Sequence, residues 1–142
     1  MNIKTFLPKN GNKICYHNSG SGGTTIVLVS GGTLGLETWN SFQNLLSKYA
    51  KVISYDRSGL GDSEYVPNSK NINYMTAELD AVINELNTNS VILVGHSIGG
   101  YIVKKYTELH PEKVGALVLI DAYHELFFKE LKNSVTENTW NT

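Results

Sequence analysis

The sequence predicts an α/β fold of three layers, in which a mostly parallel sheet lies between helices and begins with an antiparallel hairpin. Continuous apolar runs at 26–29 and 114–120 are typical of strands that are covered on both faces. Segments with helical periodicity separate such runs, and this alternation favours a parallel sheet. The length of 142 residues fits one domain.

The first two strands are expected at Ile3–Leu7 and Lys13–His17. The turn between them, Lys9–Asn12, contains an Asn-Gly pair, which is a hairpin signal. Cys15 is the only cysteine, so it forms no internal disulfide, and we expect it to be a small buried side chain.

The central part of the chain predicts two more strands and two helices. The strand Ile26–Val29 leads into a glycine-rich loop, Ser30–Gly35, which lacks the signatures of phosphate-binding and dinucleotide-binding loops. A helix is expected over 37–49, with one apolar face in the core, and this face comprises Trp39, Phe42, Leu45, Leu46 and Tyr49. The strand Val52–Tyr55 follows.

A turn-rich loop, Asp56–Ser63, comes directly after that strand. Asp56 and Arg57 are either catalytic or a structural ion pair that stabilises the loop, and we favour the ion pair. Residues 65–72 are interpreted as a polar linker. An amphipathic helix is expected over 73–87, with an apolar face formed by Met75, Leu79, Val82, Ile83 and Leu86.

The sequence Gly95-His96-Ser97-Ile98-Gly99 follows an apolar strand that starts at Val91 and precedes an expected helix, Ile98–Leu109. A serine on such a sharp turn has a strained backbone and a hydroxyl lifted above the sheet. Side chains at the flanking glycines would collide with the neighbouring strand and helix. The alternative is that Ser97 only caps the helix.

The last expected strand is Val114–Ile120. Because right-handed crossovers place the loops after parallel strands on one side of a sheet, four segments should meet there. These segments are Gly31–Thr33, Asp56–Gly59, Ser97 and Asp121–His124. We divide the chain into a core over 1–125 and a polar tail over 126–142.

Composition limits the possible partners. The net charge of −1 implies no nucleic acid and no anionic membrane. The N-terminus has no signal-peptide pattern, and no apolar run is long enough to span a membrane, so we expect a cytoplasmic protein. We expect neither a cofactor nor a metal site.

Three motifs together resemble the N-terminal signatures of α/β-hydrolases. They are the segment 95–100, the segment 55–63 (Tyr-Asp-Arg-Ser-Gly-Leu-Gly-Asp-Ser) and the segment 27–32. The resemblance implies that Ser97 is a nucleophile, and that the backbone N–H groups of Ile98 and Gly32 form an oxyanion hole. Ser30 stands where many members have histidine, which changes the hydrogen bonds of the loop more than the chemistry.

The catalytic histidine is not evident. A serine nucleophile needs a histidine base and an acid that orients it. His110 is a helix length from the turn, whereas His124 and Asp121 lie on the expected face. The family's usual histidine follows two further strands, which this sequence lacks. We therefore expect a partial hydrolase core whose strand 114–120 is an exposed edge, open to self-association.

Three hypotheses follow for function. The chain belongs to a serine hydrolase that acts on a small-molecule ester or similar acyl bond, with the base outside this sequence. Alternatively, it is an inactive hydrolase-like protein that binds or interacts, or Asp121 and His124 serve as the acid and base.

Overall fold

The computed structural model describes residues 3–6 and 11–126, and within this part of the chain six strands form one sheet. The strands are β1 (Ile3–Phe6), β2 (Ile14–Ser19), β3 (Thr25–Val29), β4 (Lys51–Tyr55), β5 (Val91–His96) and β6 (Val114–Ile120). Residues 9 and 10 of the predicted turn and all of the tail from residue 127 lie outside the described residues. The division at residue 125 therefore stays a prediction.

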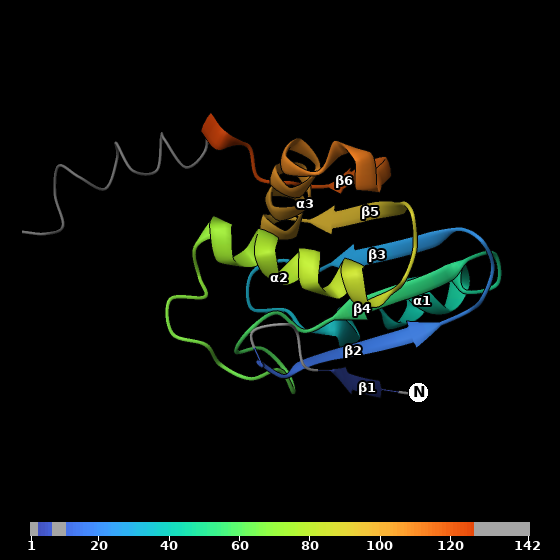
Figure 1. The fold of residues 1–142 in the computed structure, drawn as a ribbon, viewed down its shortest axis with the longest axis horizontal. Helices are drawn as coiled ribbons and strands as arrows, with labels where there is room; N and C mark the ends of the chain where they lie inside the picture. Colours follow the sequence, from blue (N-terminus) through green and yellow to red (C-terminus); the bar gives the residue numbers. More distant parts are fainter. Residues whose placement is uncertain (1–2, 7–10, 127–142) are drawn as a thin grey trace, which may run out of the picture.

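The sheet has the strand order β1-β2-β4-β3-β5-β6 (Figure 1). The expected hairpin of β1 and β2 is confirmed, and β2 also pairs antiparallel with β4. The pairs β3–β4, β3–β5 and β5–β6 are parallel, so the predicted mostly parallel sheet is confirmed. Strand β3 lies at the centre, where Ile26 is opposite Val52 on one side and Ile92 on the other.

Helices cover both faces of the sheet, as the three-layer prediction requires. Helices α2 (Ile72–Glu85) and α3 (Ile98–Leu109) pack on one face and share a core cluster with strand residues. Helix α1 (Asn40–Leu46) and the 3₁₀ turn η1 (Leu36–Trp39) lie on the opposite face, as Figure 1 shows. A second short turn, η2 (Pro111–Lys113), leads into β6.

The prediction for the first helix was wrong in length and for three of the five residues of its apolar face, whereas Trp39 and Leu46 pack in the core as expected. Instead of a helix over 37–49, η1 and α1 together end at Leu46. Phe42, Leu45 and Tyr49 are exposed, and Gln43 is fully buried. The amide of Gln43 donates to the carbonyl oxygens of His17 and Val52, and its own oxygen accepts from the Ser54 hydroxyl. With its hydrogen bonds satisfied, a polar residue takes the inward position.

Strand β6 lies at an edge of the sheet, as expected. Its last three side chains are exposed apolar groups: Val118, Leu119 and Ile120. Its backbone hydrogen-bonding groups on the side away from β5 face no other strand of the described chain. None of the described helices is both long enough and apolar enough to cross a membrane.

Candidate active site

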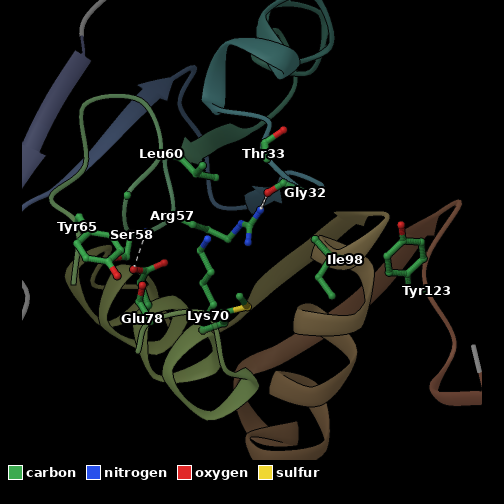
Figure 2. A pocket seen from close by; sticks show the side chains of 13 residues that line it. Gly32, Thr33, Arg57, Ser58, Leu60, Tyr65, Lys70, Glu78, Ile98 and Tyr123 are labelled. Atoms are coloured by element: carbon green, nitrogen blue, oxygen red, sulfur yellow. Dashed lines mark hydrogen bonds between the residues drawn. The ribbon is translucent and has the colours of Figure 1, made fainter. Parts of the chain in front are cut away.

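The loops that follow β3, β4, β5 and β6 meet at one edge of the sheet and line a cavity of about 440 Å³ (Figure 2). Each loop contributes: Gly32 follows β3, Arg57 follows β4, Ile98 follows β5 and Tyr123 follows β6. The predicted meeting of these segments is therefore confirmed. The segment interpreted as a linker also belongs to this site, because Tyr65, Ser69 and Lys70 line the same cavity.

Ser97 forms the turn between β5 and α3 in a backbone conformation that non-glycine residues rarely adopt. Its φ is 55° and its ψ is −123°, which confirms the predicted strain. Its side chain makes no capping hydrogen bond to α3, so the interpretation of Ser97 as a side-chain cap was wrong. Holding a serine in this conformation costs on the order of 1–3 kcal/mol, which the packing around it must offset.

Two glycines allow the turn to be this tight. A β-carbon at Gly95 would lie 2.5 Å from the Gly99 carbonyl oxygen, and a β-carbon at Gly99 would overlap the backbone of Val29. Strand β3 and helix α3 can therefore approach the turn only because both positions lack a side chain.

The backbone of Ser97 is also held from β6. Its N–H donates to the carbonyl oxygen of Ile120 at 3.1 Å, and its carbonyl oxygen accepts from the N–H of Tyr123 at 3.2 Å. Two hydrogen bonds from a separate strand and its loop thus fix both peptide groups of this residue.

The loop after β3 lies against Ser97 and is held by Arg57. A β-carbon on Gly31 would be 3.0 Å from the Ser97 β-carbon, so this loop and the turn are in close contact. One guanidinium nitrogen of Arg57 donates to the Gly31 carbonyl oxygen at 3.1 Å. The same nitrogen donates to the carbonyl oxygen of Gly32, as Figure 2 shows. Because C=O and N–H point in opposite directions across a trans peptide, this contact turns the Gly32 N–H away from Arg57.

Asp56 and Arg57 stabilise loops, but not as a pair, so the predicted ion pair was wrong. None of the ion pairs found among the described residues joins these two side chains. Asp56 instead accepts from the N–H of Leu36 at 2.7 Å and from that of Asp62 at 3.3 Å. Burial raises the pKa of Asp56, and these two N–H groups oppose that change. In the loop after β3, the Ser30 hydroxyl donates to the Gly35 carbonyl oxygen at 3.1 Å.

In the described part of the structure, the candidate acid Asp121 and the candidate base His124 do not contact each other through a hydrogen bond or an ion pair. Asp121 and His124 are both exposed, and the Nδ1 atom of His124 accepts from the N–H of Leu126 at 3.3 Å. Across residues 3–6 and 11–126, no hydrogen bond or ion pair connects His124 with Asp121 or with Ser97. His110 lies at the far end of α3, where its ring packs 4.7 Å from that of Tyr106. The roles of Asp121 and His124 stay predictions.

Sequence reasoning missed Glu78, which is 5% exposed and lines the cavity. One carboxylate oxygen accepts from the N–H of Ser58 at 3.0 Å, and the other is buried without a hydrogen-bond partner. Burial raises the pKa of Glu78 to about 7, against the lowering effects of the Ser58 N–H and the charge of Arg57. A signal was available: Glu78 falls three residues after Met75 and four before Val82, on the apolar face of α2.

Comparison with known proteins agrees with this geometry. The family model described as "alpha/beta hydrolase fold" matches residues 24–139. The 2-hydroxy-6-oxononadienedioate/2-hydroxy-6-oxononatrienedioate hydrolase of Escherichia coli K12 is 33% identical over an alignment of 113 positions, which covers 76% of this chain and 39% of that protein. The chain thus spans about two fifths of the length of the curated relatives it matches.

Solved structures give the same result. An epoxide hydrolase, CorEH, superposes with a TM-score of 0.81 at 25% identity, over 85% of this chain and 42% of that one. An esterase from Exiguobacterium antarcticum superposes with a TM-score of 0.78 at 27% identity, over 84% of this chain and 45% of that one. The curated relatives and structural neighbours are hydrolases. From the sheet order, the strained turn at Ser97 and the family match over residues 24–139, this chain belongs to the α/β-hydrolase fold family.

Proposed function

We propose that this chain carries the nucleophile and oxyanion hole of a serine hydrolase that acts on an ester or similar acyl bond. The observation that supports this most strongly is the conformation of Ser97, with a φ of 55° between β5 and α3. Strain of this kind persists where the surrounding structure enforces it, and such residues cluster at active sites.

In the proposed reaction, the Ser97 hydroxyl oxygen attacks the carbonyl carbon of the substrate, and the carbonyl oxygen gains the negative charge. The N–H groups of Gly32 and Ile98 donate to this oxygen. Both residues line the cavity, and the Arg57 contact supports the orientation proposed for the Gly32 N–H. The substrate is a small molecule that the cavity admits.

The attack releases the hydroxyl proton of Ser97, and collapse of the intermediate expels the leaving group. A general base must take this proton and return it to the leaving group. Among the described residues no histidine is hydrogen-bonded to Ser97, so no contact identifies the general base. The dyad of Asp121 and His124 is the alternative within this chain.

A second candidate function is binding without turnover. It is favoured by the exposed position of His124, whose Nδ1 atom accepts from the Leu126 N–H. A histidine oriented by an acid would instead donate from Nδ1. An inactive hydrolase-like protein would retain the cavity and the strained turn and would use them to hold a ligand.

Activated-ester hydrolysis and fluorophosphonate labelling test these alternatives. The chain and its variants Ser97→Ala, His124→Ala and Ser41→Ala are compared, with the exposed Ser41 as the matched control. Turnover and labelling that are lost only in Ser97→Ala support the nucleophile and exclude His124 as the base. Loss of turnover in His124→Ala as well favours the dyad. Labelling at Ser97 without turnover favours the binding protein, and labelling unchanged in Ser97→Ala overturns the proposal.

A further inference from the structure

The cavity holds a buried acid that the proposed reaction does not use. Glu78 projects from α2 toward the loop that follows β4, and its side chain reaches the N–H of Ser58 at 3.0 Å (Figure 2). The other oxygen of the carboxylate has no hydrogen-bond partner although it is buried. A buried charge with an incomplete set of partners lowers stability, so its presence at a cavity wall points to a role beyond packing.

The loop that Glu78 contacts is connected to the proposed oxyanion hole by one residue. Ser58 follows Arg57 directly, and Arg57 holds the carbonyl oxygens of Gly31 and Gly32. Arg57 is 7% exposed, and its Nε atom is buried without a hydrogen-bond partner. A guanidinium this well buried depends on nearby negative charge to remain where it is.

Glu78 is the acid that supplies this charge. Its carboxylate and the guanidinium of Arg57 line the same cavity and interact electrostatically. Asp56, which precedes Arg57, uses its oxygens on the N–H groups of Leu36 and Asp62. Tyr55, on β4, interacts electrostatically with Glu78. Its burial, and to a lesser degree the charge of Glu78, raise the pKa of Tyr55, so this residue stays neutral. The other ionisable residues that line the cavity are Tyr65, Lys70 and Tyr123.

We propose that Glu78 is a positioning residue for the oxyanion hole, acting through Ser58 and Arg57 on the peptide groups of Gly31 and Gly32. Its ionised form holds the loop after β4 through the Ser58 N–H and balances Arg57. Arg57 in turn fixes the direction of the Gly32 N–H. This inference rests on the proposed function, because it takes that N–H to be an oxyanion donor.

The protonation of Glu78 makes the coupling measurable without turnover. Since burial raises the pKa of Glu78 to about 7, the acid changes charge within an accessible pH range. In the ¹⁵N-labelled chain, the amide resonances of Ser58 and Gly32 should both shift between pH 5.5 and 8.5, with a shared midpoint near 7. In Glu78→Gln, which keeps the size and an acceptor, both shifts should be lost.

Two further variants test whether the coupling between Glu78 and Gly32 runs through Arg57. In Arg57→Lys, the Ser58 resonance should keep its midpoint while that of Gly32 loses it, since the guanidinium contact to the loop is gone. Glu64→Gln is the matched control: its exposed carboxylate accepts from the Lys13 N–H, and its removal should leave both midpoints in place.

Three results would overturn the proposal. If Gly32 does not titrate while Ser58 does, Glu78 acts on its own loop alone. If the Gly32 midpoint persists in Glu78→Gln, the group that titrates is not Glu78. If Arg57→Lys leaves the Gly32 midpoint unchanged, the path does not run through Arg57. None of these results depends on whether Ser97 reacts, so failure here is distinct from failure of the proposed function.

Discussion

The Cα atom of Gly99 lies so close to Val29 that a β-carbon on Gly99 would overlap the Val29 carbonyl oxygen. This contact joins the first turn of α3 to the end of the central strand β3. It brings the loop that contains Gly31 and Gly32 next to Ser97. The distance between Ser97 and the candidate oxyanion donor Gly32 therefore depends on the absence of a side chain at Gly99.

Gly99→Ala should lower the free energy of unfolding by about 1–3 kcal/mol, because the added methyl group overlaps rigid backbone rather than a movable side chain. Urea unfolding followed by circular dichroism measures the change. Gly23→Ala is the control, since a β-carbon there meets no atom within 4 Å. Equal stabilities of the two variants would contradict the close contact.

Ser97→Gly should raise the free energy of unfolding by about 1 kcal/mol. Glycine adopts a φ of 55° without strain, and the relief exceeds the entropy that glycine loses on folding. Ser97→Ala keeps the β-carbon and therefore the strain, so it should give no gain. Chemical denaturation of the three proteins checks this, and a glycine variant no more stable than wild type would disprove the strain.

The stability of the chain should fall as pH rises from about 4.5 to 7 because of Glu78. Its pKa is raised to about 7 in the folded state from 4.5, so within this range the folded chain binds a proton that the unfolded chain has released. Stability then decreases with pH, by up to about 3 kcal/mol for this group.

Glu78→Gln should remove that dependence on pH, so the free energy of unfolding of the variant should change less between pH 4.5 and pH 8 than that of the wild type. Urea unfolding of both proteins at the two pH values measures the difference. A variant whose stability falls with pH as steeply as that of the wild type would show that another group is responsible for the dependence.

We propose that the exposed edge β6 mediates self-association. Val118, Leu119 and Ile120 are apolar, exposed and adjacent to unpaired backbone groups. Sedimentation velocity should show a mass that increases with protein concentration, and Leu119→Lys should abolish the increase. Tyr49→Lys, at a site 80% exposed beyond α1, should leave it unchanged. A wild-type chain that stays monomeric at all concentrations would rule this out.

The sequence predicts the layers and the turn at Ser97 because both depend on local signals. The β6 bounds were predicted to the residue, since its apolar run ends abruptly at Asp121. Gln43 could not be predicted, because its three partners come from β2 and β4, which are distant in sequence or on the far side of a loop. A polar side chain moves inward only when tertiary structure supplies such partners.

The contacts within the site could not be predicted from the sequence for the same reason. Arg57 was singled out, but its partners are carbonyl groups about 25 residues earlier, and no charge pattern reveals a backbone acceptor. Glu78 interrupts an apolar face, which marks it as unusual without naming Ser58 as its contact. The topology of the sheet, which places β4 beside β3, brings these groups together.

The hydrogen bond from the Ser97 N–H to the Ile120 carbonyl oxygen has a consequence for the order of events during synthesis. A nascent chain that has emerged from the ribosome only as far as residue 115 contains β5 and α3, but it lacks the acceptor at 120 and the donor at 123. The strained turn thus acquires its last two supports only after a further stretch of translation. During synthesis, the Ser97 turn would therefore reach its final conformation only after β6 and the residues that follow it have been translated.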